Sequence, residues 1–397
     1  MRLSTYKKIY AFAVLLTPIL YQYSLFGGVL DLDVIAMLVV FVLGLIGHIK
    51  NSRRYIIDAL LIIVYIIVVT SINALLGPRY SSLSNMILRT SRYCLYLFIV
   101  LIRNLDCFEY EFGMKVYRVI AYMAFIYVVI QAVFYFGFRI VLPNKIGQPV
   151  QAVIGWETEM TNARPRAFFS EPSALAYSLV PFIVCSLFGK PYMKKDRREL
   201  DAIITSLAVF ISTSGQGIIC VMVIWICWIS YLFVQNKVTK YKLLEILFII
   251  GIAVIFLVSP IFQIASDRIL DAPGKFGAVT ARTSGYKTLV LLTPLQYFFG
   301  TGYGNYITKN TYGLILPYET VFYSSAAELI FTTGIVGLLL FLGLLAKGFI
   351  RGTAVSRMII ISIGILMISG SPLSGSFIPL NLSFALCLDC TRDKYKE

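Results

Sequence analysis

Two arginines stand close to a carboxylate in the middle of the chain, in a pattern suited to binding phosphate. The run Arg164-Pro165-Arg166-Ala167-Phe168-Phe169-Ser170-Glu171-Pro172-Ser173 ends where an apolar segment begins. Guanidinium groups bind phosphate oxygens in pairs, and a helix N-terminus also attracts anions. Glu171 adds a carboxylate that could serve as a base. The alternative is structural, with Ser170 or Ser173 capping the helix, Pro172 in its first turn and the arginines as surface charge.

A second pair, Arg89 and Arg92, lies inside an apolar segment. The two residues are three apart and therefore share one face of a helix. A charge within the membrane costs several kcal/mol unless it is paired or hydrated. One arginine is explained by snorkelling to the interface. Two on one face favour a pocket for an anion.

Three later features are candidates for substrate binding. The polar run Ser212-Thr213-Ser214-Gly215-Gln216-Gly217 ends a short apolar segment, so Ser214 lies either in an outward-facing cavity or in a plain hairpin turn. The cluster Gly300-Thr301-Gly302-Tyr303-Gly304-Asn305 lacks the Gly-Lys-Ser/Thr ending of a P-loop. It predicts a tight turn that brings Tyr303 and the backbone close to a ligand or another loop. Glu328 is expected to be a buried carboxylate that needs a partner.

The composition identifies the elements that must position these residues. Of 397 residues, 58% are hydrophobic and 14% are charged, whereas a soluble domain carries roughly 25% charged residues. The chain is therefore expected to be an all-α, polytopic integral membrane protein with about 12 transmembrane helices. The predicted spans lie near 9–26, 34–48, 55–76, 84–102, 116–138, 173–189, 201–214, 217–234, 243–259, 323–346, 357–370 and 376–389. The last two could instead be one broken segment.

The charge distribution predicts the orientation. With the N-terminus inside and an uncleaved first helix, the cytoplasmic segments hold 23 of the 35 Lys and Arg residues, as the positive-inside rule requires. Both termini are then cytoplasmic. The net charge of +15 is explained by this bias, which excludes nucleic acid as a partner.

Two outer loops stand out by their length within a single membrane domain, 1–397. The first large outer loop covers 139–172 and the second covers 260–322, far longer than the usual 2–8 residues between packed helices. The chemistry is therefore expected to face outward. The only histidine, His48, falls on the cytoplasmic side, so no metal site or Ser-His-Asp triad is expected outside. What remains is anion binding by arginine, with a carboxylate as base.

Four segments resemble the bacterial O-antigen and capsular polysaccharide polymerases (Wzy), within the wider O-antigen ligase superfamily. They are RPRAFFSEPSALAYSLVPF (164–182), STSGQG (212–217), RTSGYKTLVLLTPLQYFFGTGYGNY (282–306) and AELIFTTGIVGLLLFLGLL (327–345). The order of these segments along the chain is also similar to that in the family. So is the succession of an arginine-bearing outer loop and then a larger outer loop.

The resemblance implies a metal-independent glycosyltransferase of the bacterial cell (inner) membrane, with no cofactor, in O-antigen (lipopolysaccharide) or capsule biosynthesis. Its substrates would be undecaprenyl-pyrophosphate-linked oligosaccharide repeat units, and a chain-length regulator and a flippase would be its partners. Family arginines correspond to Arg164 or Arg166 and to Arg282. The related ligases usually carry a histidine in the large outer loop, which this sequence lacks. A ligase and a flippase remain the alternatives, but a flippase should show repeat-related halves and polar residues along a full path.

The orientation can be tested by labelling. In a background without the native cysteines, single cysteines near positions 150 and 310 should react with an impermeant thiol reagent in intact cells. A cysteine at position 195 should be protected, because that loop is predicted to be cytoplasmic. Labelling at position 195 together with protection at positions 150 and 310 would show that the orientation is the opposite of the predicted one.

Overall fold

The computed structural model describes residues 2–25, 30–145, 164–192, 197–235, 284–309, 312 and 320–386, with single positions 247, 251 and 258. The chain forms two compact units. Unit 1 comprises Met1–Val116 and Ala281–Glu397, and unit 2 comprises Tyr117–Thr280. Each unit is described by itself below.

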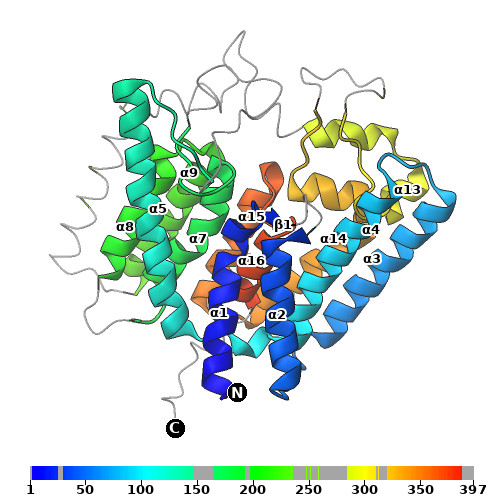
Figure 1. Cartoon of the computed structure of the whole chain (residues 1–397), viewed down its shortest axis with the longest axis horizontal. Coiled ribbons are helices and arrows are strands. Elements are labelled where there is room, and N and C mark those ends of the chain that lie inside the picture. The colour runs from blue at the N-terminus through cyan, green and yellow to red at the C-terminus, as the bar shows by residue number, and fades with distance from the viewer. Residues whose placement is uncertain are drawn as a thin grey trace. The chain divides into compact units, whose positions relative to one another are not determined.

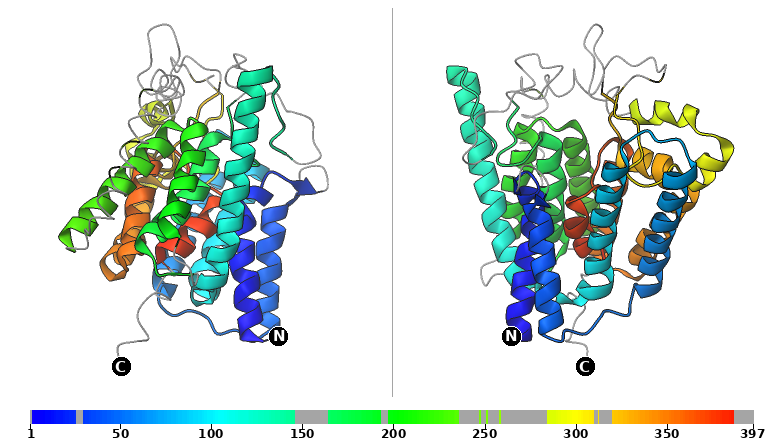
Figure 2. Two further views of the ribbon diagram at one scale, coloured as in Figure 1. Left: turned by 90° about the vertical axis from the view of Figure 1, so that its left-hand side faces the viewer. Right: turned by 45° about the vertical axis from the view of Figure 1, so that its right-hand side comes forward.

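In its described residues, unit 1 is helical apart from one short antiparallel pair of strands, β1 (Ser24–Leu25) and β2 (Leu30–Asp31), and an isolated bridge between Lys309 and Thr320. The helices α1 and α2 lie side by side, and α13 packs against α14 (Figures 1 and 2). A π-helical stretch (Phe98–Arg103) continues α4, and 3-10 turns occupy Leu105–Cys107 and Thr288–Leu291. The helices of this unit are α1 (Leu3–Leu20), α2 (Leu32–Ile46), α3 (Ile56–Leu76), α4 (Leu83–Leu97), α13 (Pro294–Phe299), α14 (Ser325–Arg351), α15 (Ala354–Ser369) and α16 (Phe377–Leu386).

Unit 2 is organised around a buried helix. The long helix α5 (Tyr110–Phe138) leads into it from unit 1, and α7 (Pro172–Phe188), α8 (Arg198–Ile211) and α9 (Gly215–Val234) follow (green in Figure 1). Helix α7 packs against both α8 and α9, and its residues are buried from Pro172 to Leu187. This helix can therefore hold its N-terminal loop in a fixed place.

The described residues confirm the all-helical class, and the helices have the character expected of a membrane protein. Five helices among the described residues are long and apolar enough to cross a bilayer, namely Ile56–Leu76, Leu83–Arg103, Tyr110–Phe138, Gly215–Val234 and Ser325–Arg351. In α3 most of the apolar side chains are exposed, Leu75 and Leu76 among them, as expected of a helix that faces lipid. The total of about 12 spans stays a prediction, and most of 243–259 lies outside the described residues.

The structure shifts the bounds of the first predicted helix and describes both parts of the last apolar region. The first helix covers Leu3–Leu20 where the sequence predicted 9–26, because the β1–β2 pair takes up the residues after it. The last apolar region forms two helices, α15 and α16, on either side of a short non-helical segment, and whether each of them crosses the membrane stays a prediction. The turn between them is fixed by Leu373, whose backbone N–H donates to Ser325 Oγ at 3.1 Å, and by the Asn381 side chain, which donates to the Pro372 carbonyl at 2.8 Å.

A break in α14 positions the turn that begins at Gly300. Gly334 has φ 68° inside this helix, which frees carbonyl groups of the preceding turn. The N–H groups of Thr301 and Gly302 donate to the carbonyls of Phe331 and Thr332 at 3.0 and 2.9 Å. The glycine cluster is therefore a tight turn against α14, as predicted.

Gly334 should tolerate no side chain. A Cβ atom there would lie 2.2 Å from the Phe298 carbonyl oxygen, and its positive φ disfavours an L-residue by about 1–2 kcal/mol. We expect Gly334→Ala to lower the melting temperature of the purified protein by several degrees. Gly343→Ala, in the same helix with open space around it, is the control and should leave stability unchanged or slightly higher. Equal melting temperatures for the two variants would contradict this account.

Candidate functional site

Helices α7 and α9 begin side by side in unit 2. A Cβ atom added at Gly217, in the first turn of α9, would lie 2.6 Å from the Cβ of Ala176 in α7. In the same place the Tyr177 hydroxyl donates to Gln216 Oε1 at 2.9 Å. The first N–H groups of a helix have no partner within it and carry partial positive charge. Two such ends together make an electropositive site.

Both arginines of the first motif are bound beside these helix ends. Arg164 donates from Nη2 to the Thr213 carbonyl at 2.6 Å and from Nε to Thr213 Oγ1 at 3.1 Å. Arg166, only 9% exposed, donates from Nη1 to the Ser170 carbonyl at 2.9 Å. Thr213 precedes α9 by two residues and Ser170 precedes α7 by two. The structure therefore brings two guanidinium groups and two helix N-termini into one cluster.

Two amide side chains that the sequence analysis missed fix this segment. Gln131 Oε1 accepts from the N–H groups of Arg166 and Ala167 at 2.9 and 2.8 Å. Asn144 donates to the Phe169 carbonyl at 3.0 Å. In the sequence, an amide side chain at Gln131 inside an apolar helix could have indicated a buried hydrogen-bonding role, and Gln131 is indeed buried. These contacts hold Ala167 at φ 50°, a backbone strain that folded proteins concentrate at functional sites.

The capping interpretation of the first motif was wrong. The N-cap residue of α7 is Glu171, with extended backbone, and its side chain makes no capping hydrogen bond. Pro172 takes the first helical position as predicted, while Ser170 offers its carbonyl to Arg166. Glu171 thus occupies the N-cap position of α7, but its carboxylate does not accept a hydrogen bond from the first turn of the helix.

Ser214 lies in a short connection of three residues between α8 and α9. It is buried and is the N-cap residue of α9, again without a side-chain capping bond. The Ser212 hydroxyl donates to the Val209 carbonyl at 2.7 Å. Thr213 has φ 55°, and its hydroxyl accepts the hydrogen bond from Arg164. This connection has the geometry of a hairpin turn, and a role for Ser214 in substrate binding stays a prediction.

A second cluster, in unit 1, joins Arg89, Tyr303 and Glu328. Glu328 is 9% exposed; Tyr303 hydrogen-bonds to its carboxylate, and Arg89 is near enough to attract it. Burial, and then the charge of Glu328, raise the pKa of Tyr303 well above its usual value, so this phenol stays protonated and can donate. Arg89 also donates a hydrogen bond from Nε to Asn85 Oδ1 at 2.9 Å, and its guanidinium carbon lies 4.8 Å from the centre of the Tyr306 ring. The expected partner for Glu328 is confirmed.

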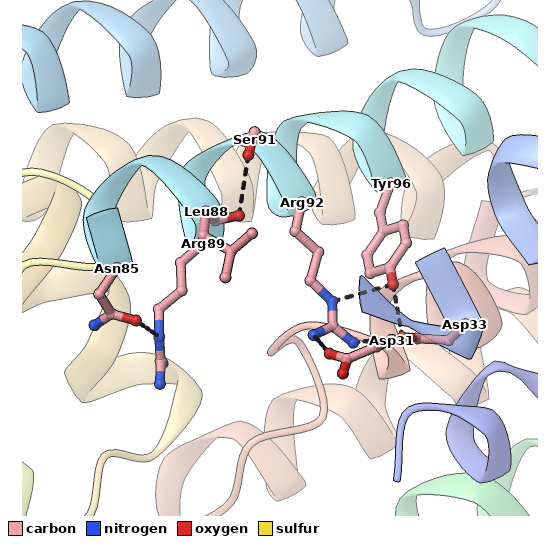
Figure 3. A network of polar contacts seen from close by, with 8 residues as sticks. All are labelled: Asp31, Asp33, Asn85, Leu88, Arg89, Ser91, Arg92 and Tyr96. Carbon is pink, nitrogen blue, oxygen red and sulfur yellow. Dashed lines mark hydrogen bonds and ion pairs between the residues drawn. The ribbon is translucent and has the colours of Figure 1, made fainter. Parts of the chain in front are cut away.

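Arg92 has carboxylate partners of its own. The two arginines leave the same side of α4 but diverge, as Figure 3 shows, and Arg92 reaches Asp31 and Asp33 at 2.5 Å each. The Tyr96 hydroxyl donates to Asp33 at 2.6 Å and accepts from Arg92 Nε at 3.1 Å. Asp33 is fully buried. We therefore interpret Arg92 as part of a structural ion pair and keep it out of the proposed anion site.

Several predicted residues fall where the structure gives no description. Arg282, the family-implied arginine of the second loop, lies outside the described residues, as do 146–163 and 259–283. The relation of Arg282 to Arg164 and Arg166 therefore stays a prediction.

Comparison with known proteins adds no assignment. No model of a known protein family matches the chain, and no curated protein is significantly similar to it. The candidate site therefore depends on the geometry of its own residues.

The role of Arg92 can be tested by stability. Arg92→Ala leaves Asp33 buried and unpaired, which typically costs 3–5 kcal/mol, so the protein should unfold at a clearly lower temperature. Adding Asp33→Asn removes the uncompensated charge and should restore much of the loss. Wild-type stability of Arg92→Ala would contradict the structural role and return Arg92 to the anion site.

Proposed function

We propose that this chain is a polysaccharide polymerase that joins undecaprenyl-pyrophosphate-linked oligosaccharide repeat units on the outer side of the bacterial cytoplasmic membrane. It would be a multi-pass enzyme of about 12 spans with both termini in the cytoplasm. A chain-length regulator and a flippase would work beside it. The resemblance of its motifs to the Wzy polymerases and its apolar helices support this proposal.

One observation carries the proposal. Arg164 and Arg166 lie at the paired N-termini of α7 and α9, where a pyrophosphate would meet both guanidinium donors and backbone N–H groups. Such preorganised donors stabilise negative charge as it develops on a leaving group. Pyrophosphate departure could then proceed with arginines in place of a metal ion.

The reaction follows from these parts. A hydroxyl at the nonreducing end of a new lipid-linked repeat attacks the anomeric carbon of the growing chain. The new glycosidic C–O bond forms, and the bond from the anomeric carbon to the pyrophosphate oxygen breaks. The proton of the hydroxyl passes to a base, for which Glu171 at the entry to α7 is our candidate. The resemblance implies Arg282 as a further arginine for the donor pyrophosphate.

A ligase is the second enzymatic possibility, and it differs in the acceptor. A ligase moves the finished glycan to another lipid or protein, whereas a polymerase accepts the next lipid-linked repeat. A flippase would bind the same lipid without breaking the pyrophosphate bond. Supplying only lipid-linked repeats therefore separates the three, since the polymerase alone would make products of increasing length.

We expect the purified enzyme to polymerise lipid-linked repeats, and Arg166→Lys to reduce the rate strongly. Losing one preorganised donor costs about 100-fold or more in turnover, and lysine keeps the charge but not the two-pronged geometry. Glu171→Gln should lose turnover more than it loses donor binding, because only the base is removed.

Arg139→Asn is the matched control. Arg139 is an exposed arginine of the same unit with φ 57°, a conformation that asparagine tolerates. The Arg139→Asn enzyme should therefore polymerise repeats at the wild-type rate. Melting temperatures must be equal across the set. Normal rates for Arg166→Lys would overturn the assigned arginine. Normal rates for Glu171→Gln would move the base to Glu319 or Glu328, or to none.

A further inference from the structure

A polar cavity lies in unit 1 where α14 ends and α15 begins. It has a volume of about 420 Å³, and Arg54, Tyr55, Arg351, Gly352 and Ser356 are among the residues that line it. Its position beside the connections 47–55 and 352–353 places it at the end of the unit that the charge distribution assigns to the cytoplasm. It takes no part in the proposed outward-facing chemistry.

The electrostatic character of this cavity is positive. Arg54 and Arg351 approach it from the start of α3 and the end of α14, and none of its described lining residues is acidic. Gly352 and Ser356 bring the first turn of α15, a helix of 16 residues, to its wall. The partial positive charge of a helix N-terminus adds to that of the guanidinium groups.

The opposing charges nearby are already compensated. The last carbonyls of α14 would repel an anion, but Arg357 donates from Nε to the Phe349 carbonyl at 3.1 Å and from Nη2 to that of Ile350 at 3.5 Å. The carboxylate of Asp58 pairs with Lys347. The cavity therefore presents two arginines and a helix N-terminus without a nearby uncompensated carboxylate among the described residues.

We propose that this cavity is a phosphate-binding site that takes the headgroup of an anionic phospholipid from the cytoplasmic leaflet. Basic pockets between membrane helices on this side bind such headgroups, and the volume accommodates a phosphate with its glycerol. A soluble phosphate has the same chemistry and is the other possible source. The site would tie α3, α14 and α15 together through one bound lipid.

The test is lipid binding to the full-length protein in neutral detergent, followed by native mass spectrometry. Phosphatidylglycerol should bind tighter than phosphatidylcholine, and each of Arg54→Gln and Arg351→Gln should weaken its affinity about fivefold. Arg53→Gln is the matched control, because Arg53 is exposed and adjacent in sequence but does not line the cavity.

Inorganic phosphate, titrated in a second arm, distinguishes the sources. Failure of millimolar phosphate to displace phosphatidylglycerol supports the lipid. Arginine-dependent phosphate binding with equal affinity for both lipids would overturn the lipid as ligand in favour of a soluble phosphate. Equal loss of affinity in Arg53→Gln and Arg351→Gln, or no loss in either, would overturn the site itself.

Discussion

Where lipid excludes water, the backbone N–H and C=O groups at helix ends must find hydrogen-bond partners inside the protein. The arrangement of the polar residues around the helix ends of this chain follows from that constraint. Helices α7 and α9 begin together in unit 2, and each leaves N–H groups without an intrahelical acceptor. The segment from Arg164 to Glu171 lies at these ends, fixed by Gln131 and Asn144. The contacts that hold this segment thereby place two arginines beside two helix N-termini and concentrate positive charge in one place.

The same constraint operates in unit 1 through glycine. The break at Gly334 frees carbonyls of α14, and the turn that begins at Gly300 supplies the N–H groups that satisfy them. This docking carries Tyr303 to the buried carboxylate of Glu328. Close backbone contact and the burial of an acidic residue are thus two results of one irregular turn.

The sequence predicted the elements better than the contacts between them. The continuous apolar run located α3 almost to the residue, and the rule that a buried carboxylate needs a partner anticipated a contact for Glu328. The identity of that partner depended on a turn 25 residues away, and the Arg92 pair joins residues about 60 positions apart. No local pattern carries such information, so the anion pocket predicted for Arg89 and Arg92 missed Asp31 and Asp33. The capping of α7 was mistaken because Gln131, from another helix, sets the backbone before it.

The central claim is that the chain lengthens a lipid-linked glycan, and the surface glycan of a deletion strain tests it most directly. Deleting the gene in its source organism and resolving the glycan by length should leave a single repeat unit in place of a ladder. Complementation with the wild-type chain should restore the ladder. A normal ladder in the deletion strain, without the protein, would contradict the account, and complete loss of surface glycan would point to a ligase or a flippase.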